Sequence, residues 1–225
     1  MKIGVISGLP RESACLDTIK RAPGDFETSS GVGPERAAHG AKAFIDAGAR
    51  GLLSFGVAGG LTEGAPAGAI ILADDVIDGD QRYFSDIGWR NKISESISDA
   101  CEVISGTLVG TDRLISTRDG KQRLQRRSAA VACDMESHAV ARIAARHGVP
   151  FVVIRAISDP HDQFVPPWLL RCLTPAGELR TWKLLWQAVQ RPGSWGDLAG
   201  LSRDAKSAFG SLRRVALRLG PGLHF

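Results

Sequence analysis

Four polar segments each follow an apolar run that predicts a buried strand, and they contain residue types suited to acid–base chemistry. They are SGLPRE (7–12), FGVAGG (55–60), CDMES (133–137) and RAISD (155–159). Carboxylates such as Glu12, Glu136 and Asp159 can transfer protons or accept hydrogen bonds. Glycines let backbone N–H groups approach an anion or a sugar closely. If the strands lie side by side, the fold brings all four segments to one rim.

Each carboxylate also has a purely structural explanation. Glu136 fits the first turn of a helix, where the helix dipole stabilises it by ~0.3–1 kcal/mol. Asp159 fits a turn ahead of Pro160, and Glu12 fits the solvated start of a helix. The order and separation of the four segments are therefore more informative than any one of them.

Strand and helix patterns alternate along the first 159 residues, which predicts an α/β fold. Strands are expected at 2–6, 50–56, 68–77, 103–109, 129–134 and 150–158, and helices at 11–21, 34–49, 90–101, 118–127 and 135–148. We expect a mixed, mostly parallel central sheet with helices on both faces, in which ligands bind beyond the C-terminal strand ends. We assign residues 1–162 to this core and 163–225 to a helical C-terminal extension.

The C-terminal extension contains a strongly periodic segment at residues 198–219. Plotted as a helix, its apolar residues occupy an arc of roughly 120°, with basic residues on the opposite side. Two roles fit this pattern. The helix covers the core or a subunit interface, or it contacts an anionic membrane surface together with the tryptophans at 168, 182, 186 and 195.

Composition and charge exclude several other classes. The apolar runs are too short to cross a bilayer and no signal-peptide pattern is present, so a cytoplasmic location is expected, peripheral at the inner membrane face if the helix binds lipid. The four cysteines (15, 101, 133 and 172) show no zinc or disulfide spacing, and no metal site is expected. Residues 160–225 carry a charge of +5 and residues 1–159 a charge of −1, which argues against a nucleic-acid-binding body.

GLPRE, GVG, G-x-AGG, DMES and RAISD occur in an order that resembles the purine/uridine phosphorylase superfamily. The resemblance covers residues 1 to about 159. Within the superfamily, this segment resembles the methylthioadenosine/S-adenosylhomocysteine nucleosidases in particular. It implies cleavage of the N-glycosidic bond of an adenine nucleoside, with no metal or organic cofactor, in a homo-oligomer.

The resemblance also implies a role for each matched residue. Glu12 activates the nucleophile with help from Arg155, and Asp159 protonates N7 of the departing purine. Glu136 binds the ribose hydroxyls. The further residues that we assign to the site are Met135, Leu114, Ile115, Ser158 and Gly59 for substrate binding, and Arg11, Gly8 and Gly33 for the nucleophile or phosphate. The chemistry suits these types, because an acid lets the base leave and carboxylates stabilise an oxocarbenium-like sugar.

Two departures leave the nucleophile open between water and inorganic phosphate. Val57 stands where the nucleosidases carry a serine. Arg11 resembles the phosphate-binding arginine of the hexameric phosphorylases.

The extension, with PPWLL and SRDAKSAFGSLRR, resembles the hopanoid-associated phosphorylases, which implies the lipid-linked nucleoside adenosylhopane as substrate. Methylthioadenosine or adenosylhomocysteine hydrolysis is one alternative, and a non-catalytic nucleoside-binding protein is another.

Overall fold

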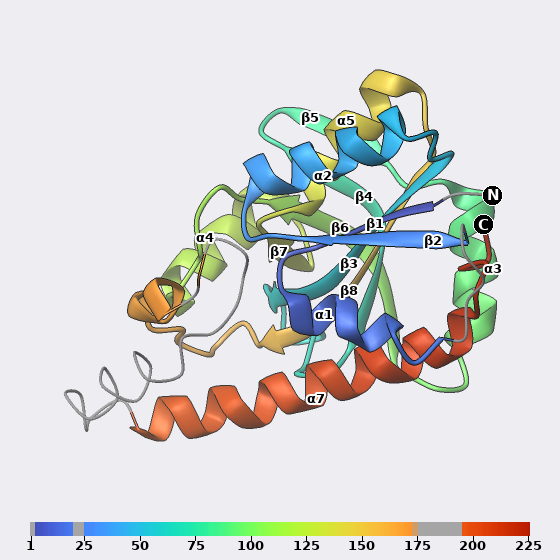
Figure 1. Cartoon of the computed structure of the whole chain (residues 1–225). Coiled ribbons are helices and arrows are strands. Elements are labelled where there is room, and N and C mark those ends of the chain that lie inside the picture. Colours follow the sequence, from blue (N-terminus) through green and yellow to red (C-terminus); the bar gives the residue numbers. More distant parts are fainter. Residues whose placement is uncertain (1–2, 20–24, 173, 175–194) are drawn as a thin grey trace.

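The structure, a computed structural model, describes residues 3–19, 25–172, 174 and 195–225 (Figure 1). Its strands are β1 (Ile3–Ser7), β2 (Phe26–Ser30), β3 (Gly51–Gly60), β4 (Ile70–Asp78), β5 (Gln81–Phe84), β6 (Val103–Gly110), β7 (Ala132–Asp134) and β8 (Phe151–Asp159). Its helices are α1 (Pro10–Leu16), α2 (Pro34–Asp46), α3 (Ile87–Ile97), α4 (Arg118–Ser128), α5 (Ser137–His147), the 3-10 helix η1 (Pro167–Cys172) and α7 (Trp195–Leu219). The expected α/β class is confirmed.

The sheet is mixed, and part of it closes on itself. β1 pairs in parallel with β2 and β3, and β3 pairs in parallel with β8. β8 also pairs antiparallel with β4, which continues in parallel through β6 to β7. β7 returns to the end of β3 at Gly59 and Gly60. The ring β3–β8–β4–β6–β7 therefore brings the C-terminal ends of β3, β7 and β8 together.

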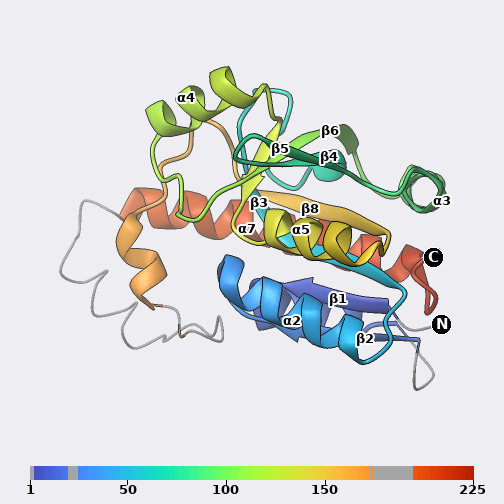
Figure 2. The same ribbon diagram turned by 90° about the horizontal axis from the view of Figure 1, so that it is seen from above.

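Helices cover both faces of this sheet. α2 and α5 pack on one face, and α1 and α7 lie on the other (Figures 1 and 2). Local sequence explains several helix ends. Pro10 and Pro34 occupy first helical positions, where the missing N–H costs no hydrogen bond. Gly148 ends α5 in the left-handed conformation, with φ of 63°, that glycine adopts readily.

Helix α7 uses its apolar side to cover the core. Five apolar residues of α7 are buried in the cluster that also contains one face of β1 and β8: Ala208, Leu212, Val215, Ala216 and Leu219. The basic side chains at 203, 206, 213, 214 and 218 are exposed. This arrangement matches the core-covering role expected for the 198–219 helix, and the buried apolar side is not available to a membrane.

No described helix is long and apolar enough to span a bilayer. Of the four tail tryptophans, Trp182 and Trp186 lie outside the described residues.

Strands β2 and β5 were not expected from the sequence. β2 is the polar run FETSS at one edge of the sheet, and β5 is the largely exposed QRYF hairpin strand at the other edge. Edge strands bury little surface, so neither has the apolar run that identifies a central strand.

Candidate active site

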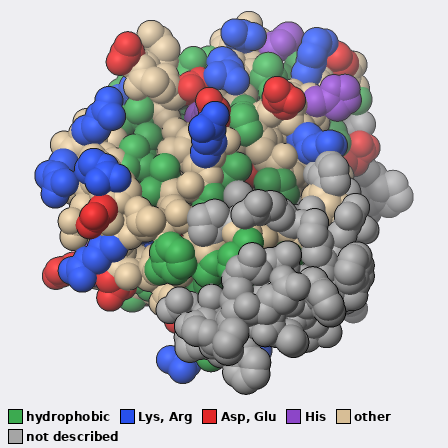
Figure 3. All heavy atoms as spheres, turned by 90° about the vertical axis from the view of Figure 1, so that its left-hand side faces the viewer, with side chains coloured by type: hydrophobic (Ala, Val, Ile, Leu, Met, Phe, Trp, Pro, Cys, Tyr) green, Lys and Arg blue, Asp and Glu red, His purple; other side chains and the backbone are tan. Residues whose placement is uncertain are grey.

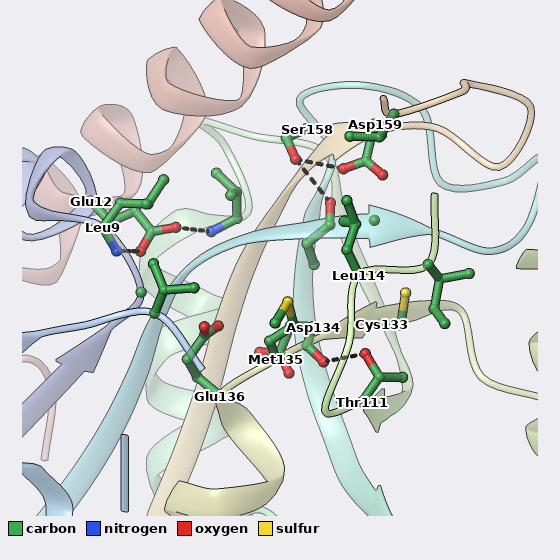
Figure 4. A pocket seen from close by; sticks show the side chains of 17 residues that line it. Leu9, Glu12, Thr111, Leu114, Cys133, Asp134, Met135, Glu136, Ser158 and Asp159 are labelled. Atoms are coloured by element: carbon green, nitrogen blue, oxygen red, sulfur yellow. Dashed lines mark hydrogen bonds between the residues drawn. The ribbon is translucent and has the colours of Figure 1, made fainter. Parts of the chain in front are cut away.

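A cavity of about 270 Å³ lies at the C-terminal ends of β1, β3, β7 and β8 (Figure 4). This volume is near the lower end of small-molecule sites, which are typically ~300–1,000 Å³. The cavity is lined by Gly8, Leu9, Glu12, Val32, Val57, Ala58, Gly59, Thr111, Leu114, Ile115, Cys133, Asp134, Met135, Glu136, Ser158, Asp159 and Val165.

The surface at the end of the molecule where α4 lies is of mixed character. Figure 3 shows hydrophobic side chains exposed there beside Lys and Arg side chains.

Glu12 is buried and its carboxylate is held by two backbone amides. Leu9 N donates to Oε2 at 2.7 Å and Val57 N donates to Oε1 at 2.8 Å. Burial raises the pKa of Glu12, while the Arg155 charge and these amides act in the opposite direction. The contact from position 57 is made by the backbone, so a valine provides it as well as a serine would. A fixed carboxylate of raised pKa accepts a proton more readily than an ordinary carboxylate, as suits a general base.

Glu136 lies between β7 and α5 and points into the same cavity (Figure 4). Its Oε1 accepts a hydrogen bond of 2.9 Å from Gly33 N. A Cβ atom on Gly8 would lie 3.1 Å from this oxygen, so the glycine leaves room for the carboxylate. Burial raises the pKa of Glu136 to about 7, with the Arg155 charge opposing and the Asp134 charge reinforcing this effect.

Arg155 lies behind the cavity, fully buried, and connects its carboxylates. Its Nη2 is 2.6 Å from Asp134 Oδ2 and 3.8 Å from Glu136 Oε2. Nη2 also donates to the hydroxyls of Ser54 and Ser137 at 2.8 and 3.1 Å. Burial alone would lower the pKa of this guanidinium, but the charges of Asp134 and Glu136 outweigh burial and raise it. Arg155 is thus a permanent cation beneath the cavity floor.

Gly56 lets the Arg155 and Glu12 side chains approach the same stretch of β3. A Cβ atom at position 56 would overlap Arg155 Nη1 and lie 2.7 Å from Glu12 Oε1. Nη1 has no hydrogen-bond partner within the described residues. Buried polar atoms without a partner are rare, so this one is an exception close to the Glu12 carboxylate.

Asp159 lies at the far end of the cavity from Glu12, at the end of β8 (Figure 4). Ser158 Oγ donates to its Oδ1 at 2.8 Å, and Lys121 Nζ donates to its Oδ2 at 2.7 Å. Gly59 is the register partner of both Asp159 and Cys133, which places these two side chains on either side of it. Burial raises the pKa of Cys133 to about 12, so its thiol is neutral.

The structure brings most of the residues assigned from sequence to one cavity. Glu12, Glu136, Asp159, Met135, Leu114, Ile115, Ser158, Gly59 and Gly8 line it. Gly33 and Arg155 touch its carboxylates from behind. Arg11 does not line the cavity: its guanidinium stacks 4.7 Å over the Phe209 ring of α7, in a separate surface hollow. Adjacent helical residues project about 100° apart, so Glu12 and Arg11 face different sides of α1.

Sequence reasoning missed Lys121, Asp134 and the two hydroxyls of Ser54 and Ser137. Asp134 and Ser137 lie within the CDMES segment, so their proximity to Glu136 was a usable signal. Lys121 lies in the basic run RDGKQRLQRR, where nothing marks one lysine as buried. Among the described residues no cluster of His, Cys, Asp and Glu could hold a metal ion.

Comparison with known proteins identifies the family of this chain. Residues 26–167 match the Phosphorylase superfamily, and the chain belongs to this family. The resemblance to this superfamily expected from the sequence is therefore confirmed. The chain is 28% identical over 111 residues to a 5'-methylthioadenosine/S-adenosylhomocysteine nucleosidase of Thermotoga maritima, covering 46% of this chain and 51% of that protein. It thus spans about half of that relative's length. It is also 28% identical over 166 residues to a futalosine hydrolase of Streptomyces coelicolor, covering 64% and 71% of the two proteins.

Solved structures share the fold. A Neisseria meningitidis 5'-methylthioadenosine/S-adenosylhomocysteine nucleosidase in complex with methylthio-immucillin-A superposes with a TM-score of 0.70 at 17% identity, covering 97% of each chain. The futalosine hydrolase of Helicobacter pylori gives a TM-score of 0.69 at 16% identity, covering 96% of this chain and 97% of that one.

Proposed function

We propose that this protein cleaves the N-glycosidic bond of an adenine nucleoside and releases adenine. One observation supports this most directly: Glu12 and Glu136 lie at one part of a single cavity, and Asp159 lies at another. A nucleoside has the matching polarity, with sugar hydroxyls at one end and a basic ring nitrogen at the other. The family to which the chain belongs, and the names of its relatives, agree with this chemistry.

In the proposed reaction, Glu136 accepts hydrogen bonds from the ribose hydroxyls and Asp159 protonates N7 of the base. The C1′–N9 bonding electrons move to the base, which leaves as neutral adenine. Glu12 takes a proton from a water molecule as the water oxygen bonds to C1′. The buried carboxylates stabilise the positive charge that develops on the sugar. An adenine amino group can also donate to the Asp159 carboxyl, which favours adenine over a 6-oxo base.

We propose water rather than phosphate as the nucleophile. Three buried carboxylates, those of Glu12, Asp134 and Glu136, surround the sugar end, with Arg155 as their buried counterion. A phosphate anion would be repelled by these carboxylates, whereas a neutral water molecule is not. The Arg11 side chain, which suggested a phosphate site, faces away from this cavity.

We also propose the identity of the group on the 5′ carbon of the substrate's sugar. The cavity lining includes the apolar side chains of Leu9, Val32 and Val57, which suit an apolar substituent. The sequence of the extension supports adenosylhopane. The exposed basic side of α7 is the surface we would expect to face an anionic membrane that supplies such a substrate. The alternative is a small soluble nucleoside, methylthioadenosine or adenosylhomocysteine, supported by the Thermotoga relative's name.

The test incubates the protein with adenosylhopane in vesicles, methylthioadenosine or adenosylhomocysteine, each with and without phosphate. Released adenine and the sugar product are quantified, with the reaction run in ¹⁸O-labelled water. We expect one labelled oxygen at C1′ of a free sugar, no dependence on phosphate, and a loss of about 10²–10⁴-fold in Asp159→Asn. A sugar 1-phosphate would overturn hydrolysis, and adenosine binding without adenine release would indicate a binding protein.

A further inference from the structure

Lys121 is a fully buried lysine whose ammonium group is saturated by the end of β8. Its Nζ donates to Asp159 Oδ2 at 2.7 Å, to the Asp159 carbonyl oxygen at 2.8 Å and to the Pro160 carbonyl oxygen at 2.7 Å. An ammonium has three N–H bonds, so each has its own acceptor. All three acceptors belong to the residue at the base end of the cavity or to its neighbour.

The position of Lys121 is costly for the fold. It lies in the first part of α4, where the helix dipole disfavours a cation, and α4 buries no other described side chain. Lysine is almost never fully buried unless paired. A buried ion pair contributes little net stability, because desolvation offsets the attraction between the charges. Holding α4 against β8 therefore does not require a lysine, since an apolar pair would do so at no greater cost.

The contacts of Asp159 indicate what the lysine does. Lys121 holds one carboxylate oxygen and Ser158 Oγ donates to the other, so the plane of the carboxyl group is fixed relative to the cavity. The backbone bonds from Lys121 also fix the strand end that carries Asp159. A general acid must be held within hydrogen-bond reach of the atom that it protonates.

We propose that Lys121 is the positioning residue of the general acid Asp159, an inference that rests on the proposed function. Lys121 directs the Asp159 carboxyl group toward the base. In the reactive state the Asp159 carboxyl group carries its proton on Oδ1, because Lys121 occupies Oδ2. When this proton passes to the ring nitrogen and the C1′–N9 electron pair leaves with the base, a carboxylate remains. The Lys121 ammonium, 2.7 Å away, stabilises that carboxylate as it forms, in the manner of a preorganised donor.

The test compares Lys121→Met with Arg123→Met, which removes an exposed cation from the same helix. Two substrates are used: the adenine nucleoside that the wild-type protein cleaves, and 4-nitrophenyl β-D-ribofuranoside, whose nitrophenolate leaves without a proton. We expect Lys121→Met to lower kcat on the nucleoside by about 10²-fold with KM changed less than about threefold. On the nitrophenyl riboside, Lys121→Met should lower kcat by less than about tenfold. Arg123→Met should have the kcat and KM of the wild type on both substrates.

A double variant tests the proposal independently of the second substrate. If Lys121 acts only through Asp159, then Lys121→Met should cost nothing more in an Asp159→Asn background, because the acid is already absent. This variant also removes both charges of the buried pair together, so no uncompensated charge remains to unfold the protein. Circular dichroism and urea unfolding check that each variant is folded.

The outcomes separate this inference from the proposed function. If Lys121→Met lowered kcat equally on both substrates, Lys121 would have only a structural role. The same conclusion would follow if the losses of kcat from Lys121→Met and Asp159→Asn were additive in the double variant. Full nucleoside cleavage by Lys121→Met would overturn the inference while the Asp159 assignment stands. Failure of the wild-type protein to release adenine from any nucleoside would instead overturn the proposed function.

Discussion

Gly59 and Asp159 are register partners between β3 and β8, and a Cβ atom on Gly59 would lie 2.9 Å from Asp159 Oδ2. Real Cβ atoms do not approach oxygen this closely, so Gly59→Ala must displace the carboxylate. Gly59 does not adopt a left-handed backbone conformation, so alanine is not excluded by its φ angle. The glycine therefore allows the Asp159 carboxylate to occupy its position.

We expect Gly59→Ala to lower kcat by up to about 10²-fold, the loss expected for a misplacement of about 1 Å at a reacting group. The matched control is Gly64→Ala, where an added Cβ atom would meet nothing within 4 Å. Steady-state kinetics and unfolding curves of both variants provide the measurement. Unchanged kcat in Gly59→Ala would show that the position of Asp159 does not limit the reaction.

Glu12→Gln tests the proposed base. The Glu12 carboxylate accepts from the amides of Leu9 and Val57, and a glutamine presents an NH₂ group to one of them. We expect kcat to fall by about 10²–10⁴-fold, while the affinity for adenosine, measured by calorimetry, changes little. The exposed Glu63 supplies the control variant, Glu63→Gln, with wild-type kinetics expected. A Glu12→Gln variant that retains kcat would remove Glu12 from the reaction.

The sequence identified strand ends better than it identified side-chain neighbours. Apolar runs show where β1, β3 and β8 end, so Glu12 and Asp159 could be assigned to one rim. Whether Arg11 or Glu12 faces the cavity depends on the rotation of α1, which seven residues of mixed polarity do not specify.

Lys121 could not be predicted at all, because its partner Asp159 lies 38 residues further along the chain. That contact depends on how α4 docks against β8, and only the three-dimensional structure supplies it. The polar edge strands β2 and β5 were missed for a related reason, since their pairing partners, rather than their own composition, make them strands.

Glu136 should make the unliganded protein less stable as pH rises. Its pKa is raised from an ordinary value of 4.5 to about 7, so the folded state binds more protons than the unfolded state in this interval. Stability is then fully present below pH 4.5 and is lost as pH rises through about 7. At about 1.36 kcal/mol per pKa unit, the contribution is on the order of 3 kcal/mol.

Glu136→Gln should remove this contribution. Urea unfolding at pH 5 and pH 8 should show a smaller loss of unfolding free energy in the variant than in the wild type. Glu12, whose pKa is also raised, contributes in the same direction. Because the two carboxylates interact, the difference between the proteins reports Glu136 together with its effect on Glu12. The exposed Glu35 gives the control Glu35→Gln, which should follow the wild type. If the unfolding free energy of Glu136→Gln and of the wild type changed equally between pH 5 and pH 8, the raised pKa of Glu136 would be contradicted.

Arg155→Met tests the buried network beneath the cavity. Arg155 is the counterion of Asp134 and Glu136, and its removal leaves buried carboxylates without a cation. Such a loss typically costs about 3–5 kcal/mol, and the pKa of Glu136 should rise further because the Arg155 charge holds it down. The control is Arg142→Met, which breaks a partly exposed ion pair with Asp78 and should cost less than about 1 kcal/mol. If urea unfolding gives both variants the same stability, the buried carboxylates do not depend on Arg155 as their counterion, and this role must be abandoned.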